Sequence, residues 1–134
     1  MVCTKTETLP LRSGEDMVRM RQTVRAWMVE RRFSLVDQTK MVTAASELAR
    51  NTVDYGGGGS ARLDLLAEGV RTGLRITFED HGPGIADIEQ AMTDGFTSGS
   101  GLGLGLGGAR RLTNEFEIWS EPGQGTRVTI TRWK

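Results

Sequence analysis

The amino-acid sequence predicts an α+β fold: a two-layer sandwich with helices on one face of a mixed, mostly antiparallel sheet. Helical and strand-like stretches follow one another in the order β-α-α-β-β-loop-α-β-β. Two pairs of consecutive strands are joined by short hairpin turns, which cannot connect parallel neighbours and so argue against a doubly wound parallel sheet. With 134 residues the chain has the length of one domain. We therefore expect residues 1–134 to form that domain.

The N-terminal half is expected to contain one strand and two helices. Residues 3–11 alternate threonine with other residues, which is typical of an edge strand. Ser13 can cap a helix that begins near Gly14, with Asp16 as its partner in a short capping box. The apolar positions that give this helix its period are Met17, Met20, Val24, Trp27 and Met28. A second helix is predicted over 37–54 by the stripe of Met41, Ala45, Leu48 and Thr52.

The C-terminal half is expected to contain two hairpins around a glycine-rich stretch. The predicted strands are 61–68, 72–79, 116–120 and 126–133. Turn residues in "GVRTG" join the first pair, and those in "EPGQG" join the second. Between the hairpins, residues 86–93 are predicted to form a short helix, and a third long helix is predicted to start within 103–116. The glycine run 56–59 is interpreted as a turn.

Composition argues against several classes of protein. Seventeen basic and seventeen acidic residues give a formal net charge of zero, so no global charge favours nucleic acid or an anionic membrane. Cys3 is the only cysteine and His81 the only histidine, which excludes an internal disulfide and argues against a structural zinc site. The N-terminal residues contain no apolar segment typical of a signal peptide, and no run is long enough to span a bilayer. We therefore expect a cytoplasmic protein.

The stretch "ELARN" places a carboxylate and a carboxamide on one face of the second helix. Glu47 and Asn51 are four residues apart, so their side chains are neighbours across one helical turn. An asparagine oxygen can ligate a hard cation such as Mg²⁺, and a glutamate can accept a proton as a general base. A solvated polar helix face is the alternative interpretation of this pair.

The stretch "DHGPG" ends an apolar strand with an acidic residue and two glycines. Gly82 and Gly84 leave room for a planar ligand beside the backbone. Asp80 would then accept a hydrogen bond from an exocyclic amine such as adenine N6. An ordinary turn at the end of a strand is the alternative, because Asp, Gly and Pro are common turn residues. We expect His81, in the middle of this stretch, to be exposed.

The stretch "GLGLGLGG" at 101–108 contains a G-x-G-x-x-G pattern, formed by Gly103, Gly105 and Gly108. It lacks the preceding strand and the downstream acidic residue of a dinucleotide-binding loop, and it lacks the GK[ST] of a P-loop. What remains is a glycine-rich loop that leads into a helix N-terminus, where backbone N–H groups favour phosphate. We expect the leucines between the glycines to pack inward: Leu102, Leu104 and Leu106.

Gly125 and Thr126 open the last strand, where by themselves they indicate only a hairpin turn.

Four motifs thus occur in a fixed order: Glu-x-x-x-Asn in a helix, Asp-x-Gly-x-Gly after a strand, a glycine-rich loop and Gly-Thr. This combination resembles the GHKL, or Bergerat-fold, superfamily of ATP-binding proteins over nearly the whole chain. The resemblance implies an ATP-binding site that uses Mg²⁺.

A closer resemblance is carried by "ELARN", "DHGPGIADIEQAMTDGFTSGSGLGLGLGGARRLTNEF" and "GQGT". These stretches look like the RsbT-type serine/threonine kinases of bacterial stress signalling, which are related to anti-sigma factor kinases. The resemblance implies that the chain phosphorylates a serine or threonine of a STAS-domain antagonist. It further implies that the released kinase activates a regulatory phosphatase, and that a stressosome scaffold is a candidate partner.

The resemblance also implies a role for each matching residue. Glu47 would be the catalytic base toward the incoming hydroxyl, and Asn51 would hold Mg²⁺ and contact the nucleotide. The adenine pocket would consist of Asp80, Gly82, Gly84 and Thr126. The loop over the triphosphate would consist of Gly101, Leu102, Gly103, Leu104, Gly105 and Gly107. Members of the group tend to have proline where this chain has Gly107, which predicts a looser loop.

Three other functions share these motifs. A histidine kinase catalytic domain needs a helical hairpin with an acceptor histidine, whereas His81 lies in the nucleotide motif and the chain has no room for that hairpin. An anti-sigma factor kinase would also phosphorylate a STAS protein but would bind a sigma factor. A non-catalytic nucleotide-gated binding module is the third, and Glu47 argues against it. For the kinase, we expect the surface that receives the STAS partner to include Arg12, Arg19 and Arg21.

Overall fold

The computed structural model describes residues 1–92 and 105–134. The elements along the chain are β1 (Val2–Leu11), α1 (Gly14–Glu30), α2 (Leu35–Arg50), the π-helical turn η1 (Asn51–Tyr55), β2 (Gly59–Glu68), β3 (Arg71–Asp80), α3 (Ile88–Ala91), α4 (Gly105–Arg111), β4 (Glu115–Glu121) and β5 (Gly125–Trp133). All five predicted strands are present, each slightly longer than the sequence indicates. Within the described ranges, no helix has the length and apolar character needed to cross a membrane.

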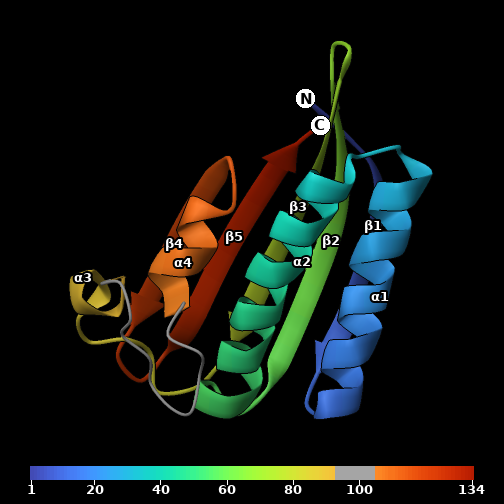
Figure 1. Ribbon diagram of the computed structural model, residues 1–134. Coiled ribbons are helices and arrows are strands. Elements are labelled where there is room, and N and C mark those ends of the chain that lie inside the picture. The colour runs from blue at the N-terminus through green and yellow to red at the C-terminus, as the bar shows by residue number, and fades with distance from the viewer. Residues whose placement is uncertain (93–104) are drawn as a thin grey trace.

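The five strands form one sheet in the order β1-β2-β3-β5-β4, and every neighbouring pair is antiparallel. The helices α1, α2 and α4 lie in a second layer on one face of this sheet (Figure 1). The predicted α+β sandwich is therefore confirmed, but the prediction of a mixed sheet is wrong for the described strands. The reason lies in the last hairpin, because β5 inserts between β4 and β3 and runs antiparallel to both.

The core lies between the sheet and the two long helices. Alternate side chains of the central strands face the helices, and the register aligns Leu63, Ile76 and Ile130 in one fully buried row. The helices contribute apolar positions that the sequence spacing predicts: Met20, Val24 and Met28 from α1, and Met41, Ala45 and Leu48 from α2. Burial of this apolar surface is the main driving force for the sandwich.

Side-chain caps fix where the two long helices begin. The Ser13 hydroxyl accepts a hydrogen bond from the Asp16 N–H at 3.3 Å, and Asp16 Oδ2 accepts one from the Arg12 N–H at 2.8 Å. Ser13 therefore caps the helix as predicted, but Asp16 bonds the N–H of Arg12, one residue before the cap, and not that of Ser13 as in a capping box. The second helix begins at residue 35, earlier than predicted, because Ser34 caps it and accepts from the Asp37 N–H at 3.1 Å.

The helices end at other residues than the sequence predicts, and for α4 the cause is a contact with a distant strand. The second predicted helix continues to residue 54 only as the π-helical turn η1. The prediction of a third long helix is wrong, since α4 ends at Arg111 after seven described residues. Arg132 on β5 donates to the Leu112 carbonyl oxygen at 2.8 Å, and the same guanidinium pairs with Asp37 on α2. That contact ties the turn after α4 to the sheet, so the helix ends and β4 begins.

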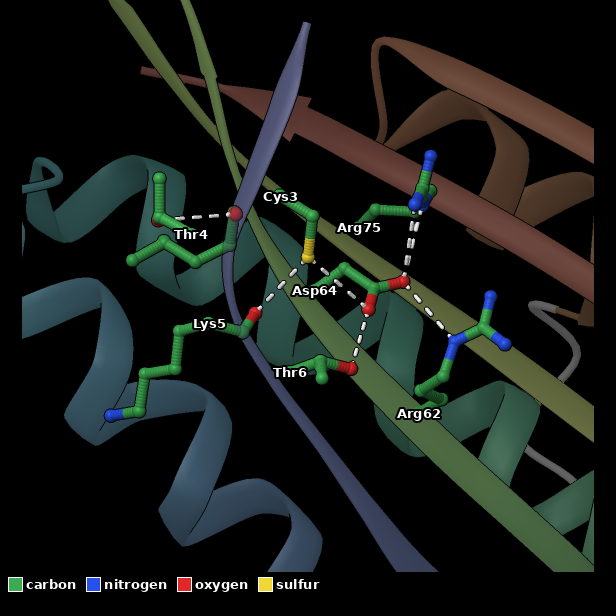
Figure 2. A network of polar contacts seen from close by, with 8 residues as sticks. Cys3, Thr4, Lys5, Thr6, Arg62, Asp64 and Arg75 are labelled. Carbon is green, nitrogen blue, oxygen red and sulfur yellow. Dashed lines mark hydrogen bonds and ion pairs between the residues drawn. The ribbon is translucent and has the colours of Figure 1, made fainter.

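A polar network occupies the sheet face that points away from α1 and α2 (Figure 2). Asp64 on β2 is buried, and its Oδ1 accepts a hydrogen bond from the Thr6 hydroxyl at 2.7 Å. Oδ2 accepts from Arg62 Nε at 3.2 Å and from Arg75 Nε at 3.3 Å. Burial alone would raise the pKa of Asp64, but the Thr6 hydrogen bond and the two guanidinium charges outweigh it and hold the pKa below its ordinary value of 3.8. Asp64 therefore stays ionised and joins β1, β2 and β3.

Candidate nucleotide-binding site

Three polar side chains from neighbouring strands form a row at one end of the sheet. The register pairs Asp80 at the end of β3 with Thr126 on β5, and Thr126 with Ser120 on β4. Directly paired residues point to the same side of a sheet. Here that side is the helical layer, because Phe78 and Val128, two residues away on their strands, belong to the core. The fold therefore brings together Asp80 and Thr126, which the family resemblance predicts as neighbours.

Asp80 is an almost buried carboxylate with one oxygen available. Its exposed fraction is 8%, and Oδ1 accepts a hydrogen bond from the Gly82 N–H at 2.9 Å. Oδ2 accepts no hydrogen bond from residues 1–92 or 105–134. No fully buried side-chain oxygen of the described residues lacks a partner, so Oδ2 is the part of Asp80 that a ligand or water can reach. Oδ2 therefore suits an exocyclic amine such as that of adenine.

Two glycine backbones pack closely beside Asp80. A Cβ atom on Gly56 would overlap the Asp80 carboxylate, and a Cβ atom on Gly82 would lie 2.7 Å from the Gly56 Cα atom. A side chain at either position would therefore displace the carboxylate or its neighbour. The sequence motif predicts this role for Gly82 but not for Gly56, whose only signal is the glycine run 56–59, interpreted as a turn.

The loop that follows Asp80 is held from two sides. Gly84 has a φ of +76°, in the left-handed region, and a Cβ atom there would overlap the Glu121 carbonyl oxygen. From the other side, the Tyr55 hydroxyl donates to the Gly84 carbonyl oxygen at 3.0 Å. The turn η1 and the end of β4 thus fix the loop. His81 within it is exposed, as predicted.

Ser120 is a member of the polar row that the sequence motifs do not identify. Its hydroxyl oxygen accepts a hydrogen bond from the Ile85 N–H at 2.7 Å and lies 2.9 Å from Thr126 Oγ1. It can also donate to the Gly125 carbonyl oxygen at 3.0 Å. The available sequence signal is the hairpin itself, whose register places a serine opposite Thr126.

Glu47 is buried and partly paired. Its exposed fraction is 5%, and Oε2 lies 3.1 Å from Arg50 Nη1. The alternative of a solvated polar face is therefore wrong for Glu47. Oε1 accepts no hydrogen bond from the part of the chain that the structure describes. One carboxylate oxygen is thus available to receive a proton from a hydroxyl group.

Asn51 lies at the junction of α2 and η1, one helical turn after Glu47. It is half-buried, and its side chain makes no hydrogen bond to a described residue, which leaves the carboxamide oxygen available. Within 1–92 and 105–134, no group of three or more His, Cys, Asp or Glu side chains could hold a metal ion. A carboxamide oxygen is a ligand that Mg²⁺ accepts alongside water and phosphate oxygens.

The glycine-rich motif lies only partly within the described residues. Outside them are Gly101, Leu102, Gly103 and Leu104. Gly105 and Gly107 are buried in α4, which packs against α2, so both belong to a helix rather than to a loop. Leu106 is buried in the core, as predicted. Arg110 and Arg111 are exposed in the last turn of α4.

Known proteins are similar to this chain in sequence. The family model for histidine kinase-, DNA gyrase B-, and HSP90-like ATPases matches residues 36–134. The chain is 44% identical to the serine/threonine-protein kinase RsbT of Bacillus subtilis (strain 168) over 118 residues, which cover 88% of this chain and 89% of RsbT. It is 33% identical to an anti-sigma F factor of Thermoanaerobacter sp. (strain X514) over 96 residues, which cover 68% of this chain and 66% of that factor.

Solved structures share the fold. The structure of the RsbU and RsbW domains of Rv1364c from Mycobacterium tuberculosis matches 96% of this chain with a TM-score of 0.67 at 22% identity. This chain corresponds to 32% of that longer chain. The mycobacterial sensor histidine kinase MprB matches with a TM-score of 0.51 at 18% identity, over 96% of this chain and 97% of the MprB chain. At these identities the likeness shows the fold alone.

Proposed function

Because this chain belongs to the histidine kinase-, DNA gyrase B-, and HSP90-like ATPase family, and within it to the RsbT-type group, we propose that it is a serine/threonine protein kinase. It uses Mg-ATP to phosphorylate a STAS-domain antagonist in a bacterial partner-switching pathway, with residues 1–134 acting as one kinase domain. The observation that carries the proposal is the available Oδ2 acceptor of Asp80 beside the packed backbones of Gly56 and Gly82. This arrangement suits a flat base with an exocyclic amine.

We assign the adenine pocket to Asp80 and its neighbours. Asp80 Oδ2 would accept a hydrogen bond from adenine N6, while Gly82 and Gly84 let the base approach the backbone. Thr126, which is paired with Asp80 across the sheet, would hold the same edge of the base. The triphosphate would contact Gly101, Leu102, Gly103 and Leu104, together with the N-terminal end of α4, where Gly105 and Gly107 lie. Backbone N–H groups of that stretch would offset the phosphate charge.

Phosphoryl transfer depends on positioning and charge neutralisation more than on covalent help from the protein. When bound, Mg²⁺ would neutralise charge on the phosphates, and Asn51 would supply the oxygen ligand from the protein. Glu47 would accept the proton of the attacking serine or threonine hydroxyl at Oε1, while the ion pair with Arg50 holds Oε2 in place. Burial of Glu47 keeps this acceptor in a fixed orientation.

The partner surface is proposed on and next to α1. Arg12 and Arg19 are exposed and Arg21 is half-buried, so an acidic STAS surface could contact them. Arg12 lies beside the turn that contains Gly58, close to the candidate nucleotide site. An RsbT-type function also implies that the released kinase activates a regulatory phosphatase and works in the cytoplasm, with a stressosome scaffold as a candidate partner.

A second candidate is a kinase that binds a sigma factor, which the 33% identity to an anti-sigma F factor favours. The two candidates differ in the partner that is retained after phosphorylation, so a binding assay with a sigma factor separates them. A non-catalytic nucleotide-gated module needs no base, and the buried Glu47 with one unpaired oxygen argues against it.

The test is transfer of label from γ-labelled ATP, in the presence of Mg²⁺, to a STAS-domain protein from the same gene neighbourhood. We expect label on a serine or threonine of the STAS protein, and a loss of about 100-fold in Asn51→Ala. Thr39→Ala removes an exposed hydroxyl from the same helix and should retain full transfer. ATP binding without transfer would favour the binding module. Absence of ATP binding would refute the adenine pocket.

A further inference from the structure

Ser120 connects the loop after Asp80 to the start of β5. Its hydroxyl oxygen accepts from the Ile85 N–H at 2.7 Å, on that loop. The same hydroxyl lies 2.9 Å from Thr126 Oγ1 and 3.0 Å from the Gly125 carbonyl oxygen. One side chain on β4 therefore holds two segments that the proposed adenine pocket uses.

The number of protons limits how these hydroxyl groups can be arranged. Ser120 has one proton, and both the Gly125 carbonyl oxygen and Thr126 Oγ1 lie within range to accept it. If Ser120 donates to the carbonyl, Thr126 donates to Ser120 and keeps its lone pairs for a ligand. If Ser120 donates to Thr126, the Thr126 proton is the group left for a ligand. In both arrangements Thr126 Oγ1 is held in one place, on the strand position paired with Asp80.

We propose that Ser120 is a positioning residue for recognition of the base: it fixes the Thr126 hydroxyl and the 80–85 loop against the adenine edge. The inference rests on the proposed function, because it takes Asp80 and Thr126 as the groups that face the base of ATP. Ser120 acts through Thr126 and Ile85, so it should contribute to binding of the base and not to binding of the triphosphate.

Ser120→Ala removes the acceptor of the Ile85 N–H and leaves the Thr126 hydroxyl free to rotate. We expect the Kd of ATP to rise about tenfold, which corresponds to ~1.4 kcal/mol at 25 °C. The Kd of inorganic tripolyphosphate, which has no base, should stay unchanged. A general loosening of the fold would instead weaken the binding of both ligands.

Calorimetric titration of the full chain with Mg-ATP and with Mg-tripolyphosphate tests this difference. Ser120→Thr keeps the hydroxyl and should restore the affinity for ATP. Ser46→Ala is the matched control, because the Ser46 hydroxyl donates to the Val42 carbonyl oxygen within α2; it should change neither affinity. In a Thr126→Val background, Ser120→Ala should weaken ATP binding less than it does in the wild-type chain.

Several results would overturn the inference. One is wild-type affinity for ATP in Ser120→Ala, and another is an equal loss of affinity for ATP and tripolyphosphate. Fully additive effects of Ser120→Ala and Thr126→Val would also overturn it. A wild-type chain that binds no ATP would refute the proposed function, and the inference with it. ATP binding that Ser120→Ala leaves unchanged would refute the inference alone.

Discussion

Gly56 is the residue whose substitution tests the proposed adenine pocket most directly. Gly56→Ala adds one methyl group, and that group would overlap the Asp80 carboxylate. The backbone would accept alanine, because Gly56 has a φ of −82° and a ψ of −9°, a right-handed conformation open to any residue. The substitution therefore perturbs the contact with Asp80 and leaves the local backbone preference intact.

Relief of the overlap requires Asp80 or η1 to move. Overpacking of this kind costs ~1–3 kcal/mol of unfolding free energy, and for a chain of this size each kcal/mol lowers the Tm by about 3–5 °C. A displaced carboxylate also loses the alignment of its hydrogen bond with the Gly82 N–H. Because the Oδ2 acceptor moves with it, we expect the affinity for ATP to fall by about tenfold or more.

Thermal unfolding with and without Mg-ATP separates the two effects. The Tm of the wild-type chain should rise with ATP, whereas Gly56→Ala should start lower and rise little. Gly14→Ala is the matched control, because a Cβ atom there meets nothing within 4 Å; its Tm and its response to ATP should equal or slightly exceed those of the wild type. Full stabilisation of Gly56→Ala by ATP would refute the placement of adenine beside Asp80.

Further substitutions test the base, the partner surface and the polar network. Glu47→Gln should lower label transfer by about 10²–10⁴-fold and leave the Kd of ATP essentially unchanged; transfer at the wild-type rate would exclude Glu47 as the base. Reversal of both Arg19 and Arg21 to Glu should weaken binding of the STAS partner in a titration, and unchanged affinity would place that surface elsewhere. Asp64→Asn should lower the unfolding free energy at neutral pH by ~1–3 kcal/mol, because Thr6 and two arginines lose a charged acceptor. The folded-state pKa of Asp64 lies below 3.8, so this contribution is present above that pH and is lost as the pH falls through the folded-state pKa. Urea unfolding of the two proteins should therefore differ less in acid, and a difference independent of pH would contradict the network.

The layers of the fold could be predicted because they follow from patterns within single segments. The apolar stripe of α2 is visible in the spacing of Met41, Ala45 and Leu48, and such a stripe faces a core in most contexts. The end of α4 depends instead on Arg132, which lies 20 residues from the Leu112 carbonyl group that it binds. A local pattern does not encode that contact. The pairing of β3 with β5 likewise depends on which strands meet after the chain has folded.

The residues of the candidate site likewise include some that local motifs predict and others that only the folded chain brings to the site. Asp80, Gly82 and Thr126 lie in short motifs of recognisable residue types, so the sequence could predict them. Gly56 and Ser120 join the same site only through a close backbone approach and through the register of β4 with β5. Glycine in a turn and serine in a strand occur for many other reasons, so residue type alone does not distinguish them.

The two carboxylates of the candidate site differ in their hydrogen bonding from the third buried carboxylate in the described chain. Asp64, on the opposite face of the sheet, accepts hydrogen bonds at both oxygens. Asp80 and Glu47 each use one oxygen, which accepts from the Gly82 N–H and from Arg50 respectively. No fully buried side-chain oxygen of the described residues lacks a hydrogen-bond partner, so the second oxygen of Asp80 and the second oxygen of Glu47 are both open to solvent. A ligand can therefore reach both oxygens, and they are the acceptors that we assign to the exocyclic amine of adenine and to the acceptor hydroxyl.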